Sequence, residues 1–105
     1  MNTKATKGIS KTRKPLWKFC LYVANQTPRS VQALNNLNDF CKREFPGRYA
    51  IKVVDVLAKP HLALKENIVA VPTLVRVAPA PMRRVIGNLT DRSRMILGLD
   101  LRLSA

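Results

Sequence analysis

The sequence predicts one α/β domain in which strands and helices alternate along the chain. Three observations support this fold class. The length of 105 residues suits one domain rather than two. The 47% hydrophobic content is enough to fill a core. Apolar residues recur with period two in some segments and with helical spacing in others. No run of about 18 apolar residues occurs, so we expect no membrane span.

The first strand is predicted over Leu16 to Ala24, where apolar side chains alternate between two faces. A turn follows at Asn25–Pro28. Thr27 can cap the free N–H groups of a helix, and Pro28 fits the first helical position. The helix is predicted to run to about Glu44. Its buried stripe comprises Val31, Leu34, Leu37, Phe40 and Cys41.

The second strand is predicted over Tyr49 to Val56. The short joints of this strand–helix–strand unit predict a right-handed crossover with parallel strands. Lys59-Pro60 begins a short helix that ends near Asn67. A third strand covers Thr73 to Val77, and a fourth covers Met82 to Ile86 after a proline-rich corner. Thr90 or Asp91 then caps a last helix that reaches about Leu101.

The segment 94–101 is ambiguous between helix and strand. Met95, Ile96 and Leu99 form a stripe with helical spacing, whereas Met95, Leu97 and Leu99 share one face of a strand. Gly98 disfavours a helix interior by about 1 kcal/mol relative to Ala, but it weakens a strand as well. The pattern therefore leaves open whether the segment is a helix, a strand, or each in turn.

The formal net charge is +13, from 19 basic and 6 acidic residues. Residues 1–15 contribute +5 of it and contain no acid, so we expect a flexible basic tail ahead of a domain at 16–105. The tail lacks the apolar stretch of a secretory signal, and two distant cysteines fit a reducing, cytoplasmic location. The charge itself favours a second hypothesis, a small nucleic-acid-binding protein.

The predicted order, βαβαββα, is that of the thioredoxin fold, and Pro72 lies where thioredoxins keep a cis-proline. Redox chemistry, however, requires a paired low-pKa thiol, usually in Cys-x-x-Cys. Neither Cys20 nor Cys41 has such a partner, and His61 has no neighbouring carboxylate in the sequence. We therefore expect no enzyme, cofactor or metal site, with a thiol oxidoreductase as the weakest hypothesis.

Several motifs in this order resemble the KaiB family over roughly Leu16 to Leu101. Their order and spacing carry the resemblance more than any single motif. The matching segments are Leu21-Tyr22-Val23-Ala24, Thr27-Pro28, the strand from Tyr49 to Leu57, Pro60, Pro72-Thr73-Leu74, Pro79, Pro81, the stretch from Arg83 to Leu89, and the stretch from Ile96 to Leu101.

The resemblance implies a metamorphic fold and a regulatory, non-enzymatic function. Such proteins rest as tetramers or dimers in the order βαββααβ, and a rare monomer of order βαβαββα binds the hexameric ATPase KaiC. A KaiA-like protein and a sensor histidine kinase are further implied partners. Two packings that differ by a few kcal/mol are enough for such a switch. Segment 94–101 would be a strand at rest and a helix in the bound form.

The resemblance also assigns residues. Gly98 and Asp100 would favour the resting fold, and Ala50, Lys52, Arg76, Arg83 and Arg84 would contact the partner. In two places the sequence departs from the family pattern, with Asn25 in place of a glycine and Ala80 in the middle of a triple proline. These departures leave open whether the protein serves a circadian clock or stress adaptation.

Overall fold

A computed structural model describes residues 16–101, and the predicted basic tail at 1–15 lies outside the described residues. The order of elements is βαβαββα, as the sequence predicts. The elements are β1 (Trp17–Val23), α1 (Pro28–Glu44), β2 (Tyr49–Asp55), α2 (Pro60–Lys65), β3 (Thr73–Ala78), β4 (Arg83–Ile86) and α3 (Arg92–Gly98).

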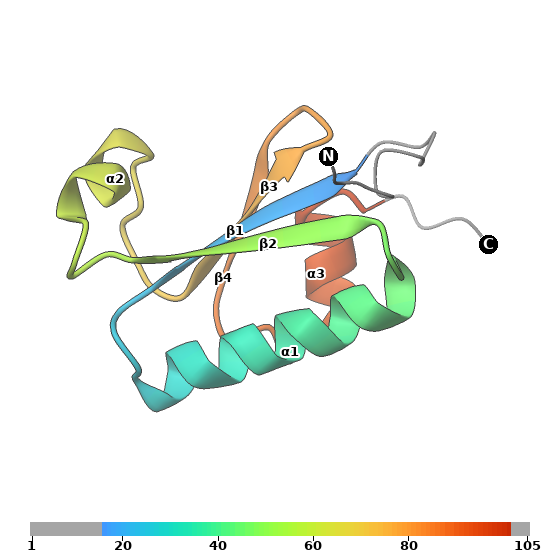
Figure 1. The fold of residues 1–105 in the computed structure, drawn as a ribbon, viewed down its shortest axis with the longest axis horizontal. Coiled ribbons are helices and arrows are strands. Elements are labelled where there is room, and N and C mark those ends of the chain that lie inside the picture. Colours follow the sequence, from blue (N-terminus) through green and yellow to red (C-terminus); the bar gives the residue numbers. More distant parts are fainter. Residues whose placement is uncertain (1–15, 102–105) are drawn as a thin grey trace, which may run out of the picture.

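The four strands form one sheet in the order β2-β1-β3-β4. Strands β1 and β2 are parallel, which confirms the predicted crossover, and the other two pairings are antiparallel. Helices α1 and α3 lie against the same face of the sheet, whereas α2 lies at one end of it (Figure 1). Much of the second face is therefore left without a covering helix.

The larger core lies between the sheet and helices α1 and α3. It collects one side of β1, namely Phe19, Leu21 and Val23, together with residues of both helices. The alternate residues Cys20 and Tyr22 belong to a smaller cluster near α2. Two clusters on opposite faces are the expected result of period-two alternation in a strand with neighbours on both faces.

Helix α1 begins as predicted. The Thr27 side chain accepts a hydrogen bond from the Ser30 N–H at 3.3 Å, and Pro28 occupies the first turn. The predicted burial of Val31 is wrong, because its side chain is 45% exposed. Val31 lines a shallow hollow with Val53 on β2. Since β2 is the outermost strand, no further strand covers this side of α1.

The ambiguous C-terminal segment is helical in this fold. The Asp91 side chain accepts from the Arg94 N–H at 3.2 Å and caps α3. The helix ends at Gly98 rather than at the predicted Leu101, because Asp100 has a left-handed backbone with φ 51°. The Asp100 N–H donates to the Leu97 carbonyl, and the Leu101 N–H donates to the Ile96 carbonyl. This pair of bonds is a Schellman motif, which terminates a helix.

Helix α2 ends in the same way. The Asn67 N–H donates to the Leu64 carbonyl at 3.2 Å, and the Ile68 N–H donates to the Ala63 carbonyl at 2.9 Å. Asn67 has a φ of 55°, which again is left-handed. Both helices in the second half of the chain therefore end in a Schellman motif with a non-glycine residue in the left-handed position.

Candidate functional site

The part of the second sheet face that α2 leaves open carries three of the five predicted partner-binding residues. Ala50 pairs with Lys18 across β2 and β1, and Lys52 pairs with Cys20. Cys20 also pairs with Val75 on β3, which pairs with Arg84 on β4. Because directly paired residues lie on the same face, Lys52 and Arg84 stand at opposite ends of one row across all four strands.

This open face is cationic around an apolar centre. Lys18, Ala50, Lys52 and Arg84 are all exposed. Val77, two residues beyond Val75 on β3, is 42% exposed. Such a surface can bind a partner that offers carboxylates around a small apolar area, since paired charges give an interface its register and specificity. We call these five residues the open face.

Arg84 has contacts within the molecule as well. Its Nη1 donates to the Asn67 carbonyl at 3.1 Å, and its Nη2 donates to the Glu66 carbonyl at 3.0 Å. Both carbonyls belong to the segment that follows α2. No pattern in the sequence indicates these bonds, because they join residues 17 and 18 positions apart across two elements.

Arg76 lies on the opposite face and is buried. It pairs with Phe19 on β1 and is 4% exposed. Its Nη1 donates to the Asp100 carbonyl at 2.9 Å, its Nη2 donates to the Pro81 carbonyl at 2.7 Å, and its guanidinium carbon lies 5.8 Å from the centre of the Trp17 ring. Arg76, which the resemblance assigns to partner contact, is therefore buried in this fold, where these groups take the place of solvent around its guanidinium.

Arg83 is exposed but does not lie on the open face. It pairs with Arg76 across β3 and β4, so it faces the side of the sheet that packs on α3. The structure thus brings Ala50, Lys52 and Arg84 together and separates Arg83 and Arg76 from them.

The two residues predicted to govern the fold lie at the end of α3. Gly98 is the last helical residue, and a Cβ atom there would overlap the Cγ2 methyl of Val85 on β4. Asp100 follows the helix by two residues, near the negative end of its dipole. The residue thus lies at the C-terminal end of the helix, and its backbone carbonyl accepts a hydrogen bond from the Arg76 guanidinium.

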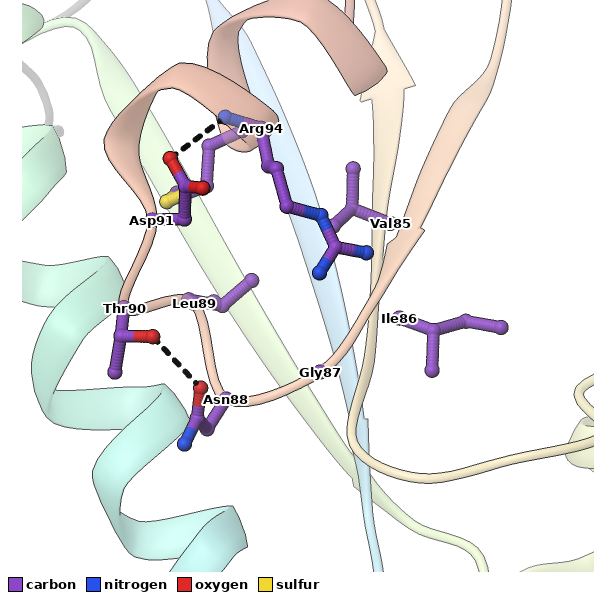
Figure 2. A pocket seen from close by; sticks show the side chains of 9 residues that line it. Val85, Ile86, Gly87, Asn88, Leu89, Thr90, Asp91 and Arg94 are labelled. Carbon is purple, nitrogen blue, oxygen red and sulfur yellow. Dashed lines mark hydrogen bonds between the residues drawn. The ribbon is translucent and has the colours of Figure 1, made fainter.

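The connection from β4 to α3 encloses a small hollow of about 40 Å³ (Figure 2). The Thr90 hydroxyl donates to the Asn88 side-chain oxygen at 3.2 Å, and the Asp91 cap of α3 lies beside it. A space of this size holds a few water molecules rather than a cofactor. We read these polar contacts as the means by which the turn into α3 is fixed.

The place where thioredoxins carry their redox motif is occupied by the α1 cap. The Val71–Pro72 bond is cis, as considered from the sequence, and so are the Ala78–Pro79 and Ala80–Pro81 bonds, which the sequence reasoning missed.

Both cysteines are buried and free. Burial raises the pKa of Cys41 to about 12 and also raises the pKa of Cys20. Both thiols are therefore protonated and poorly nucleophilic at neutral pH.

Within residues 16–101, no group of three or more His, Cys, Asp or Glu side chains is close enough to hold a metal ion. Over that range no helix has the length and apolar content to span a bilayer.

Comparison with solved structures identifies the fold. The N-terminal domain of Synechococcus elongatus SasA superposes with a TM-score of 0.69 at 19% identity, over 90% of this chain and 93% of that one. Mitochondrial thioredoxin 3 from Saccharomyces cerevisiae superposes with a TM-score of 0.64 at 15% identity, over 84% and 80%. The fold is therefore thioredoxin-like, with a four-stranded sheet.

Sequence comparison identifies the family. The KaiB domain matches residues 20–101. The circadian clock oscillator protein KaiB of Cyanothece sp. (strain PCC 7425 / ATCC 29141) is 52% identical over 88 residues, which are 84% of each chain. The protein of the same name from Acaryochloris marina is 54% identical over 81 residues, covering 77% of this chain and 78% of that one. Because the family model covers most of the chain and these relatives are more than half identical over most of their length, the chain belongs to the KaiB family.

Proposed function

We propose that this protein is a non-enzymatic regulator that binds a KaiC-like hexameric ATPase through the open face and modulates its ATPase or phosphorylation cycle. The observation that carries the proposal is the open face itself, on which the exposed cations Lys18, Lys52 and Arg84 surround the exposed apolar side chains of Ala50 and Val77. The names of the relatives support a role in circadian timing, and stress adaptation is the other setting for the same interaction.

Fold switching is part of the proposal. The order βαβαββα is the one that the family resemblance assigns to the binding monomer, and a resting tetramer or dimer of order βαββααβ would hide it. Only the fraction of chains in the binding fold contributes to affinity, so the apparent dissociation constant rises as that fraction falls. Slow association then follows from the conversion. A KaiA-like protein and a sensor histidine kinase are proposed as further partners.

The test is binding to a purified KaiC-like hexamer in its ATP-bound and ADP-bound states. Lys52→Glu reverses a charge on the open face and should weaken binding at least tenfold, a typical effect for a charge inside an interface. Lys42→Glu makes the same change on α1 and is the matched control, because Lys42 is exposed on the other side of the sheet. Equal effects of the two variants would contradict the assignment of the open face.

The alternative, nucleic-acid binding, rests on the +13 charge. Titration of the wild-type chain with duplex DNA and single-stranded RNA at 50 and 200 mM salt separates the two functions. Binding to nucleic acid should weaken steeply as salt rises, because each phosphate contact releases a counterion. Tight nucleic-acid binding together with nucleotide-independent, weak binding to the hexamer would replace the proposed function with the alternative.

A further inference from the structure

Two arginines on neighbouring strands each hold the C-terminal end of a helix. Arg84 on β4 donates to the Glu66 and Asn67 carbonyls, directly after α2. Arg76 on β3 donates to the Asp100 carbonyl, directly after α3. The second half of the chain thus uses the same contact twice, once on each face of the sheet.

The carbonyls that accept these bonds have a common backbone setting. Asn67 and Asp100 are the left-handed residues of the two Schellman motifs, with φ of 55° and 51°. Carbonyls at the end of a helix have no intrahelical donor, and the helix dipole places partial negative charge there. A guanidinium suits such a helix end on both counts. Its several N–H groups donate to the free carbonyls, and its positive charge is attracted to the partial negative charge.

Arg76 joins three segments at once. Besides the Asp100 carbonyl it binds the Pro81 carbonyl in the corner between β3 and β4, and its guanidinium lies over the Trp17 ring at the start of β1. It is 4% exposed. Removing a buried hydrogen-bonded charge leaves its partners without solvent or donor, which makes such positions sensitive.

These contacts require the present order of elements. The bonded residues are 17, 18 and 24 positions apart, and one pair links β4 to α2 while another links β3 to α3. A rearrangement of the second half of the chain would break them together. We infer that Arg76 and Arg84 are internal clamps that select this fold, and that they influence partner binding through the population of the fold, in addition to any direct contact that Arg84 makes on the open face. The consequence for binding rests on the proposed function, whereas the effect on the fold does not.

Lysine substitutions separate a clamp from a contact residue. Lys retains the positive charge that an acidic partner would recognise, but its single ammonium group lacks the fork of a guanidinium, with which Arg84 reaches two successive carbonyls. Arg83→Lys is the matched control. Arg83 is the neighbour of Arg84 on β4, is exposed, and lies on the opposite face.

The experiment is amide hydrogen exchange of the full chain, followed residue by residue by NMR. Arg84→Lys should speed exchange at the Asn67 and Ile68 amides about tenfold, the expected effect of losing a charge-assisted hydrogen bond, and should leave the Leu101 amide unchanged. Arg76→Lys should speed exchange at the Leu101 amide and leave the Asn67 and Ile68 amides unchanged. It should also speed exchange at the amides of β3. Arg83→Lys should leave amide exchange unchanged at the C-terminal ends of both α2 and α3.

Unchanged exchange at both helix ends in Arg84→Lys and Arg76→Lys would overturn the inference. So would a loss of partner affinity in Arg84→Lys without any change in exchange or in the NMR spectrum, because that result shows that Arg84 acts by contact alone. Because Arg76 is buried, Arg76→Lys can unfold the chain. In that case the exchange result for Arg84→Lys, at an exposed position, tests the inference. If the wild-type chain binds no KaiC-like hexamer, the proposed function fails, and the exchange data still test the clamps.

Discussion

Gly98, at the end of α3, packs so closely on Val85 of β4 that a Cβ atom at position 98 would overlap the Cγ2 methyl of Val85. The glycine therefore has a packing role in this fold, beyond its low helix propensity. Without a side chain at this position, the last turn of α3 can approach the outer strand. A valine side chain is stiff, because its branched Cβ restricts rotation about χ1, so the overlap is not relieved easily.

The first prediction concerns this contact. Gly98→Ala gains up to about 1 kcal/mol of helix propensity but loses about 1–3 kcal/mol from overpacking, so this fold should become less stable by about 1 kcal/mol. In a Val85→Ala background the same substitution should be neutral or stabilising. Urea unfolding of the wild type, Gly98→Ala, Val85→Ala and the double variant gives the coupling free energy between the two positions. Additive effects of the two substitutions would contradict the predicted overlap.

This contact bears on the expectation that Gly98 and Asp100 favour the resting fold, from which it follows that Gly98→Ala with Asp100→Arg should favour the binding fold. The Val85 methyl opposes the Gly98 part of that hypothesis. The Asp100 part stays a prediction. The helix dipole favours a cation near the C-terminus of α3 by about 0.3–1 kcal/mol, whereas the neighbouring Arg76 guanidinium and the left-handed backbone of residue 100 oppose an arginine there. Solution NMR of the double variant and of Asp100→Arg alone would separate the two parts, and an unchanged fold distribution in both would contradict the hypothesis.

A second prediction concerns the left-handed residue after α2. Asn67 is exposed with φ 55°, a conformation in which glycine has no steric penalty. Asn67→Gly should therefore stabilise this fold by about 0.5 kcal/mol, and Asn67→Val should destabilise it by about 1–2 kcal/mol. Thermal unfolding of both variants provides the measurement. A destabilised glycine variant would show that the Asn67 side chain, rather than its backbone, matters.

A third prediction concerns pH. The backbone N–H groups of Asn25 and Leu57 donate to Asp55 at 3.1 and 2.9 Å and hold the pKa of its carboxyl below the ordinary value. A carboxyl whose pKa is lowered on folding contributes stability above its unfolded pKa of about 3.9 and loses it as pH falls through the folded pKa. The stability difference between wild type and Asp55→Asn should therefore shrink below pH 4. A difference that is constant from pH 6 to pH 2.5 would contradict this assignment.

A fourth prediction concerns the two thiols. Because both are buried and the pKa of Cys41 is about 12, iodoacetamide should not modify the native chain at pH 8, and both thiols should react once urea unfolds it. Cys41→Ser places a hydroxyl in a fully buried site and should destabilise the fold by about 1–3 kcal/mol. Rapid labelling of the folded protein at neutral pH would instead favour the thiol oxidoreductase hypothesis.

The sequence was informative wherever one element decides the outcome by itself. Alternation in β1 predicts its two faces, and Thr27 with Pro28 predicts the start of α1. Such features depend on local periodicity and capping, which a sequence displays directly.

Features that depend on several elements could not be predicted. Arg76 is a basic residue in an apolar strand, and its burial depends on a carbonyl 24 positions away and on a tryptophan in another strand. Val31 fits the buried stripe of α1, but it lines an open hollow beside the edge strand β2 and is 45% exposed. The early end of α3 depends on the left-handed backbone of Asp100, for which an aspartate is only a weak signal.

The outer strands of the sheet have a consequence for how copies of the chain behave together. Both edges of the order β2-β1-β3-β4 carry exposed cations, Lys52 on one and Arg83 with Arg84 on the other. An uncovered edge invites pairing with a strand of another copy, and like charges there oppose it. The cations on the edge strands thus oppose edge-to-edge aggregation of the chain by electrostatic repulsion. This repulsion should weaken as salt screens the charges.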